Sequence, residues 1–145
     1  MPNCYQTRVI DAPIEKVWEA IQNFHNLSWA PNVITSVKKI GELSGKEIGA
    51  KRILNDAFEE TLIAIDDKKH TFSYSIDEGV SPVSSKEVSN YLGVVKLLPI
   101  TLSNQTFIEW QSSWEAKTIE AEEFCHTIYV SLMNDLNETI KNKGE

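Results

Sequence analysis

The chain has 145 residues, a formal net charge of −7 and 41% hydrophobic residues, which is the size and composition of one globular domain. A domain of this length buries about two thirds of its unfolded surface, so its core needs neither disulfides nor a metal ion. The acidic balance argues against nucleic acid as a partner, because binding to a phosphate backbone requires a basic surface. We therefore expect residues 1–145 to form a single domain.

Hydropathy and cysteine content indicate a cytoplasmic protein without stable membrane insertion. No run approaches the ~18 apolar residues of a membrane-spanning helix, and the N-terminus lacks the apolar region of a secretory signal. Cys4 and Cys125 lie far apart and form no CxxC motif. We expect both to be small buried apolar residues. The sequence leaves the oligomeric state open.

The N-terminal part of the chain predicts a strand followed by two short helices. Residues 5–11 are rich in β-forming residues. Pro13 suits the first turn of a helix, where its missing N–H has no partner to lose. The apolar residues after it have helical spacing, namely Ile14, Val17, Trp18 and Ile21. Residues 27–30, just before Pro31, fit one further helical turn.

The remainder predicts six more strands and one long helix. The strands are expected over residues 33–40, 50–55, 58–65, 70–76, 88–97 and 106–116, with Pro99 closing the fifth of these. Residues 119–141 predict a helix with a wide apolar stripe, which includes Phe124, Ile128, Leu132 and Leu136. Strands bunched in one run indicate an α+β fold, in which the sheet is the only large surface available to that stripe.

Alternation along the strands places aromatic residues and one carboxylate on the face that meets this helix. The residues expected there are Phe58, Glu60, Leu62, Phe72, Tyr74, Ile76, Tyr91, Trp110 and Trp114. Buried tyrosines, tryptophans and carboxylates need polar partners, which water or a ligand in a cavity would supply. The alternative is a filled aromatic core, and a shift of strand register would turn Glu60 to solvent.

The chain resembles the START-like, Bet v 1-like superfamily (SRPBCC), which includes the polyketide cyclase/dehydrase and lipid-transport families. The resemblance covers nearly the whole chain. It rests on Ala12-Pro13 and Val17-Trp18 in the opening motif, on Trp29-Ala30-Pro31, and on the strand that begins at residue 106 with the final helix. It implies the helix-grip fold, a curved seven-stranded antiparallel sheet wrapped around a long C-terminal helix. A hydrophobic ligand usually lies between the two.

The plant hormone-receptor branch of this superfamily implies particular pocket positions. Asn90-Tyr91 looks like that branch's Asn-Tyr on the sixth strand, and further matches fall at Glu60, Tyr74, Ile76, Trp110, Phe124, Ile128 and Leu132. Two features depart from the branch. Ile34 stands where the receptors have a carboxylate-binding lysine, and their gate-loop sequences are missing around Asp56 and Gly79. The resemblance therefore implies neither a hormone receptor nor an acidic ligand paired with a buried lysine.

Motifs for metal, nucleotide or nucleophilic chemistry are missing, so no cofactor is expected. His25, His70 and His126 are not spaced with other residues as metal ligands would be, and the sequence has no Walker, GxGxxG or GxSxG motif. The strongest catalytic hypothesis is proton transfer by Glu60 with Tyr74 or Tyr91. It requires burial to raise the pKa of the carboxyl group toward neutrality.

The sequence supports two main hypotheses for the function, and it supports a third only weakly. The first is binding or transport of a small hydrophobic, lipid-like or polyketide-like molecule without catalysis. The second is a cyclase or dehydratase that uses Glu60 and a pocket tyrosine, and the location and titration of Glu60 discriminate between the two. The third is a protein-interaction module, for which Phe107 on the outer face is the only sign. The predicted ligand-binding residues are Ile34, Phe58, Glu60, Leu62, Phe72, Tyr74, Ile76, Tyr91, Trp110, Trp114, Phe124, Ile128 and Leu132.

Overall fold

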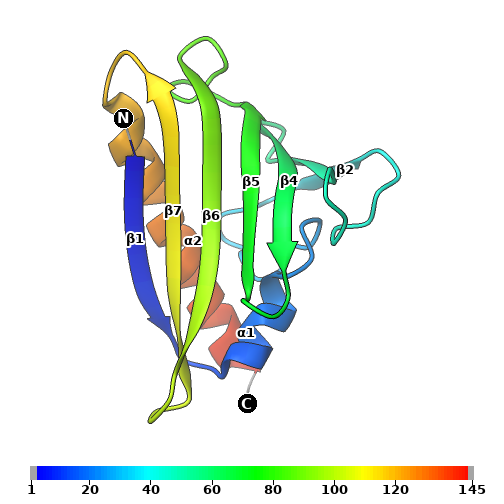
Figure 1. Ribbon diagram of the computed structural model, residues 1–145, viewed down its shortest axis with the longest axis vertical. Helices are drawn as coiled ribbons and strands as arrows, with labels where there is room; N and C mark the ends of the chain where they lie inside the picture. The colour runs from blue at the N-terminus through cyan, green and yellow to red at the C-terminus, as the bar shows by residue number, and fades with distance from the viewer. Residues whose placement is uncertain (1–2, 144–145) are drawn as a thin grey trace.

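The computed structural model describes residues 3–143, which form a curved seven-stranded sheet and two helices (Figure 1). The elements are β1 (Asn3–Ile10), α1 (Ile14–Ile21), β2 (Val37–Ile40), β3 (Lys51–Leu54), β4 (Phe58–Asp66), β5 (Thr71–Glu78), β6 (Val88–Ile100), β7 (Gln105–Ala116) and α2 (Glu120–Lys143). The sheet order is β1-β7-β6-β5-β4-β3-β2. Every neighbouring pair is antiparallel. This is the α+β helix-grip arrangement that the sequence predicts.

The long helix α2 packs its apolar stripe against one face of the sheet and runs behind β1, β7 and β6 in Figure 1. The residues of the stripe are buried at helical spacing, as Tyr129, Met133, Leu136 and Ile140 illustrate. Each large apolar side chain buried in this way stabilises the fold by roughly 1.5–3 kcal/mol. The stripe therefore fixes which face of α2 meets the sheet.

Only one of the two predicted short helices forms. In α1, Ile14, Val17, Trp18 and Ile21 are all buried, as their spacing predicts. Residues 27–30 form a turn instead, closed by a 3.0 Å hydrogen bond from the Ala30 amide to the Leu27 carbonyl. Pro31 follows directly and disfavours helical geometry at the residue before it, so the turn does not extend into a helix.

Strand β2 is shorter than predicted because an asparagine side chain binds the residues before it. Asn55 accepts hydrogen bonds at Oδ1 from the backbone amides of Thr35 (2.7 Å) and Ser36 (3.3 Å). Its Nδ2 donates to the Val33 carbonyl at 3.0 Å. These backbone groups bind Asn55 instead of a neighbouring strand, so β2 begins at Val37 and not at residue 33.

Strand β6 is longer than predicted and continues through Pro99. Its pairing with β5 reaches only Lys96, whereas its pairing with β7 continues to Ile100. Beyond Lys96 the strand therefore has one open edge. A proline lacks the N–H needed for a ladder hydrogen bond, and an open edge is where a strand tolerates it.

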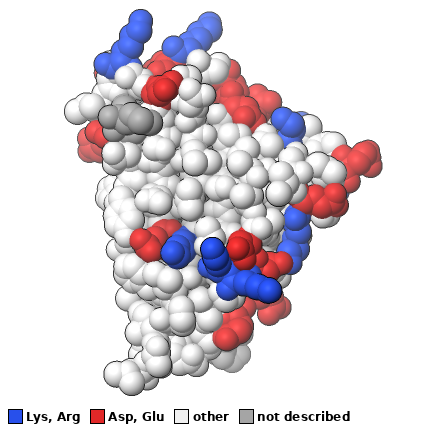
Figure 2. All heavy atoms as spheres, in the orientation of Figure 1, with Lys and Arg blue, Asp and Glu red and all other residues white. Residues whose placement is uncertain are grey.

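Figure 2 shows an uneven distribution of charge on the outer face of the sheet. Acidic and basic side chains gather at one end, along the β2–β4 side and in a band across the middle of the face, whereas the β6–β7 hairpin end is uncharged in this view. Leu102 in that hairpin is fully exposed. Phe107 is only partly exposed, so it adds no support to the protein-interaction hypothesis.

Candidate functional site

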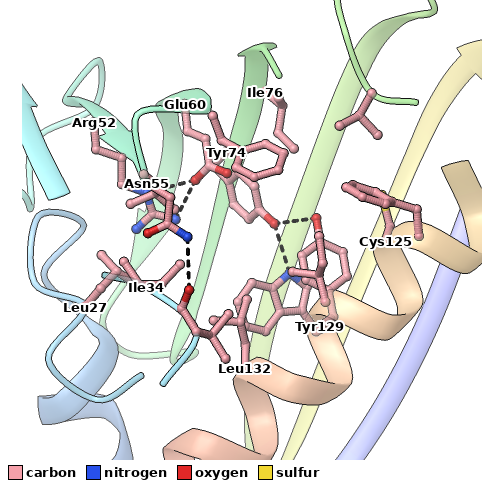
Figure 3. A pocket seen from close by; sticks show the side chains of 17 residues that line it. Leu27, Ile34, Arg52, Asn55, Glu60, Tyr74, Ile76, Cys125, Tyr129 and Leu132 are labelled. Atoms are coloured by element: carbon pink, nitrogen blue, oxygen red, sulfur yellow. Dashed lines mark hydrogen bonds and ion pairs between the residues drawn. The ribbon is translucent and has the colours of Figure 1, made fainter. Parts of the chain in front are cut away.

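A cavity of about 250 Å³ lies between strands β3–β5, β7 and the first half of α2 (Figure 3). Its walls are mainly apolar and aromatic. It is lined by Leu27, Val33, Ile34, Arg52, Leu54, Asn55, Phe58, Glu60, Tyr74, Ile76, Val83, Trp110, Phe124, Cys125, Ile128, Tyr129 and Leu132. The sheet and helix thus do not close completely on each other, and the filled-core alternative does not describe this part of the molecule.

A buried ion pair forms one wall of the cavity. Arg52 on β3 and Glu60 on β4 are direct cross-strand partners. The Arg52 Nε donates to Glu60 Oε1 at 2.8 Å, and the second contact, from Nη2, reaches the same oxygen at 2.6 Å. Nη1 donates to the Phe24 carbonyl at 2.8 Å, while the guanidinium lies 3.8 Å from the centre of the Phe24 ring. These contacts hold the pair rigidly although both side chains are more than 90% buried.

The carboxyl group of Glu60 has an unusual electrostatic environment. Burial raises its pKa, and the charge and hydrogen bond of Arg52 oppose that rise without cancelling it. Because both contacts from Arg52 fall on Oε1, Oε2 accepts no hydrogen bond from the residues that the structure describes. Glu60 therefore offers the cavity an acceptor oxygen without a partner.

A chain of hydroxyl groups runs from β5 to α2 along the next part of the wall. The Trp110 indole N–H donates to the Tyr74 hydroxyl at 3.0 Å, which in turn donates to the Tyr129 hydroxyl at 2.8 Å (Figure 3). The Tyr129 hydroxyl is also hydrogen-bonded to that of Tyr91, and Tyr91 donates to Ser112 Oγ at 3.0 Å. Along the chain from Trp110 to Ser112, each tyrosine hydroxyl accepts one hydrogen bond and donates one. The chain is therefore satisfied without a ligand.

The position of Tyr74 depends on a glycine in the neighbouring strand. Tyr74 pairs directly with Gly93 of β6, and a Cβ atom at Gly93 would lie 2.4 Å from the tyrosine ring. Only glycine leaves room for the ring, which lies edge-on to Trp110. Burial raises the pKa of Tyr74, with the charge of Glu60 adding to the effect. The hydroxyl therefore stays protonated and is a weak proton donor.

Most of the predicted ligand-binding residues line this cavity. They are Ile34, Phe58, Glu60, Tyr74, Ile76, Trp110, Phe124, Ile128 and Leu132. The strand alternation and the stripe of α2 therefore located the inward faces correctly. Whether these residues bind a ligand is a separate matter, which the geometry alone leaves as a prediction.

Four predicted residues lie in the packed core outside the cavity. Leu62 is completely buried, and Phe72 packs against the Trp18 ring. Tyr91 and Trp114 stack on each other with their ring centres 5.3 Å apart. All four point inward as predicted, but at their positions α1, α2 or neighbouring rings fill the space between sheet and helix. Tyr91 therefore reaches the cavity only through its contacts with two lining residues, Tyr129 and Cys125.

The most important residue that sequence reasoning missed is Arg52. No buried lysine was expected in the pocket, and Ile34 indeed leaves no cation at that position. The cation comes instead from Arg52 on β3. Arg52 and Leu54 are buried on the inner face of this strand, whereas Lys51 is exposed. In the sequence, Arg52 adjoins another charged residue, Lys51, so the sequence alone does not indicate its burial. The other missed lining residues are Leu27, Val33, Leu54, Asn55, Val83, Cys125 and Tyr129.

The described residues show no arrangement suited to a metal ion. Within residues 3–143, no three His, Cys, Asp or Glu side chains are grouped closely enough to hold one. The rings of His25 and His126 each hydrogen-bond elsewhere, to the Lys51 carbonyl and to Gln6. Neither α1 nor α2 has the length and apolarity that a membrane-spanning helix requires.

The fold and this internal cavity agree with what comparison of the sequence finds. Residues 1–134 match the family described as polyketide cyclase / dehydrase and lipid transport. The chain belongs to this family. A comparison with curated proteins finds no match.

Solved structures support the same grouping. A protein from Nitrosospira multiformis is 48% identical with a TM-score of 0.94, and the match covers 96% of each chain. The protein XoxI from Bacillus cereus is 25% identical with a TM-score of 0.81, covering 100% of this chain and 99% of that one. A putative uncharacterized protein from Bacillus thuringiensis is 26% identical with a TM-score of 0.78, covering 95% and 98%.

Proposed function

We propose that this protein binds a small, mainly apolar molecule in the cavity between the sheet and α2. The observation that carries the proposal is a cavity with apolar walls and one buried ion pair at its side, formed by Arg52 and Glu60. Pockets that bind organic molecules commonly combine apolar walls with a few fixed polar groups. The family's description, which includes lipid transport, supports the same class of function.

The size of the cavity argues for a compact ligand. Its volume of about 250 Å³ lies just below the ~300–1,000 Å³ typical of sites for drug-sized molecules. An apolar cavity of ~150 Å³ in another protein holds benzene. A molecule of one or two rings, or a short acyl chain, fits these limits. A lipid with two long chains would require the helix to move away from the sheet.

The polar wall argues for a neutral ligand that carries a hydrogen-bond donor. The charge of Arg52 is already balanced by Glu60, so an anionic ligand would find no uncompensated positive charge in this ion pair. Glu60 Oε2 can accept a hydrogen bond from a hydroxyl or N–H group. The tyrosine hydroxyls already have hydrogen-bond partners within their own chain. We therefore assign the polar anchor of the ligand to Glu60.

Acid–base catalysis by Glu60 is the second candidate function. Two observations favour it: Glu60 lies in the cavity wall, and burial raises the pKa of its carboxyl group. The tyrosines contribute less than the sequence suggested, since the Tyr74 hydroxyl is engaged by Trp110 and Tyr129 and Tyr91 lies outside the cavity. A Glu60→Gln variant that still binds but no longer turns over a bound polyketide-like molecule would establish this function.

The test of binding combines native mass spectrometry with a pair of matched variants. Ile128 lines the cavity from α2, whereas Thr127 beside it on the same helix is exposed. We expect Ile128→Trp to fill the cavity and Thr127→Trp to leave it open. Freshly purified wild-type protein and both variants would be measured, and any bound molecule would be extracted under denaturing conditions.

We expect a co-purifying molecule of low mass in the wild type and in Thr127→Trp, and its loss in Ile128→Trp. If the protein carries nothing, the same three proteins would be titrated with naphthol as a compact probe. Binding that is equal in all three proteins, or missing from the wild type and the control, would contradict the proposal. Circular dichroism of each variant would verify that the fold is retained.

A further inference from the structure

Two cysteine thiols lie where β1 faces the first half of α2, and neither takes part in the Arg52–Glu60 ion pair. Cys4 is 7% exposed, Cys125 is 4% exposed, and both are free. Cys4 Sγ lies 3.0 Å from Ser112 Oγ, and the Tyr91 hydroxyl lies 3.0 Å from the same Ser112 oxygen and 3.5 Å from Cys125 Sγ. Ser112 and Tyr91 thus hold the two thiols in one group of contacts. Residues from opposite ends of the chain thus form one compact cluster.

The polar surroundings of Cys4 make this pair more reactive than thiols in an apolar core. Interaction with the Cys125 thiol lowers the pKa of Cys4 to about 7, with Ser112 and Gln6 contributing and burial opposing. The same interaction, together with burial, raises the pKa of Cys125. The thiolate form is therefore favoured at Cys4. The thiolate is the form that reacts with oxidants and disulfides.

A small oxidant has a route to the pair through the cavity. Cys125 lines the cavity from α2, as Figure 3 shows, while Cys4 lies behind it on β1. The cavity is large enough for a molecule such as hydrogen peroxide to reach the Cys125 sulfur. Cys4 needs no access of its own, because its only partner in the reaction is Cys125.

We propose that Cys4 and Cys125 form a reversible disulfide that joins β1 to α2 beside the cavity, with a hydroperoxide as the oxidant. The Cys125 sulfur attacks one peroxide oxygen while its proton passes to Cys4. The O–O bond breaks, the departing hydroxide takes the proton from Cys4 and leaves as water, and Cys125 becomes a sulfenic acid. The Cys4 thiolate then attacks this sulfur and the S–S bond forms, while the departing hydroxide takes a proton from solvent and leaves as a second water. The dithiol loses two electrons, which reduce hydrogen peroxide to two waters.

The disulfide would affect stability strongly because it joins residues near the two ends of the domain. Closing a long loop removes much of the conformational freedom of the unfolded chain. For a domain of this size we expect the melting temperature to rise by roughly 5–10 °C on oxidation. It would also hold the first half of α2 against β1. This inference holds whether or not the cavity binds a ligand.

The test is oxidation of the reduced, desalted wild-type protein with hydrogen peroxide, followed by alkylation in denaturant and intact mass spectrometry. We expect a monomer that is lighter by two hydrogen atoms and not alkylated, a single cross-linked peptide pair containing Cys4 and Cys125, and reversal by dithiothreitol. Oxidation in urea would proceed at least tenfold more slowly, because unfolding separates the two sulfurs.

Two matched variants complete the test. Cys4→Ser and Cys125→Ser preserve side-chain size, and each should yield an alkylatable or over-oxidised monomer with no rise in melting temperature on oxidation. Three results in the wild type would overturn the proposal: two alkylated cysteines after oxidation, a disulfide-linked dimer, or equal rates of disulfide formation in native protein and in urea. None of these depends on the folding of the variants.

Discussion

Two groups of buried polar side chains line neighbouring parts of the cavity, and they differ in how completely they are satisfied. The hydroxyl chain from Tyr74 on β5 through Tyr129 on α2 to Tyr91 on β6 is neutral and internally hydrogen-bonded. On β3 and β4, Arg52 and Glu60 are charged, and one carboxylate oxygen has no partner among the described residues. A satisfied neutral network stabilises a core, whereas a charged group with spare hydrogen-bonding capacity is suited to recognition.

The free-energy cost of burial is also lower for the hydroxyl chain than for the ion pair. A hydroxyl in a hydrogen-bonded chain loses little on leaving water. An ion pair loses several kcal/mol per charge in hydration, which its mutual attraction recovers only with good geometry. The Arg52–Glu60 pair is therefore a weak contributor to stability as a unit, and its retention in the cavity wall is better explained by a role in binding. The variants below test this contrast, beginning with the largest expected effect.

Removing Arg52 alone should have the largest effect on stability. Arg52→Met leaves Glu60 buried without its partner, which we expect to lower the free energy of unfolding by about 3–5 kcal/mol. Urea denaturation measures this directly. The double variant Arg52→Met/Glu60→Leu should recover most of the loss, and Lys51→Met, at the exposed neighbour, should change stability by about 0–0.5 kcal/mol. A single variant as stable as the wild type would show that the pair is not buried.

Gly93→Ala should disturb the junction between the two groups. The new Cβ would meet the Tyr74 ring at 2.4 Å, so the ring must move from its place beside Trp110. We expect a loss of about 1–3 kcal/mol, typical of overpacked cores. The loss should largely disappear in a Tyr74→Leu background, where nothing occupies that space. Equal losses in both backgrounds would mean that Tyr74 does not lie over Gly93.

Tyr91→Phe should have a smaller effect and should spare ligand binding. The variant removes the hydroxyl that joins Tyr129 to Ser112, at an expected cost of about 1–2 kcal/mol. Because Tyr91 does not line the cavity, affinity for any ligand should stay within about twofold of the wild type. Tyr5→Phe, which removes an exposed hydroxyl bonded to Glu109, is the control for both measurements. A large loss of affinity in Tyr91→Phe would place Tyr91 in the binding site.

The smallest effect is expected at Glu78, at the end of β5 and outside both groups. Hydrogen bonds from Ser85, followed by the Gly79 amide, lower the pKa of Glu78 from 4.5 to about 2. A lowered pKa in the folded state contributes stability above pH 4.5, and this contribution is lost as the pH falls toward 2. The melting temperature of Glu78→Gln should therefore fall less than that of the wild type between about pH 5 and about pH 3. Parallel curves would exclude this interaction.

The fold could be predicted from the sequence because its patterns are local. The stripe from Ile14 to Ile21 and the stripe of α2 have the helical period, and β7 alternates between buried and more exposed residues. The predicted strand ends were wrong where a side chain or an open strand edge determines where a strand begins or ends. Asn55 binds the backbone of residues 33–36, and the open edge of β6 accepts Pro99. Neither effect has a periodic signal in the sequence.

The sequence predicts which face of the sheet carries the site, but not which residues on that face line the cavity. Alternation identified Glu60, Tyr74 and Trp110 as inward residues, but it could not distinguish the cavity wall from the packed core around Trp114. That distinction depends on how closely α2 approaches each strand. Arg52 was missed because a Lys-Arg pair resembles an exposed strand, and its burial depends on partners that only the folded sheet brings to it.

The most direct measurement of the central claim compares naphthalene with naphthol, which adds one hydroxyl group to the same rings. Isothermal titration of the wild type should show both binding, with naphthol about tenfold tighter because its hydroxyl donates to Glu60. The difference should vanish in Arg52→Met/Glu60→Leu, while naphthalene still binds. Equal affinities for the two probes in the wild type, or the same preference for naphthol in the double variant, would contradict the assignment of Glu60 as the polar anchor of an otherwise apolar site.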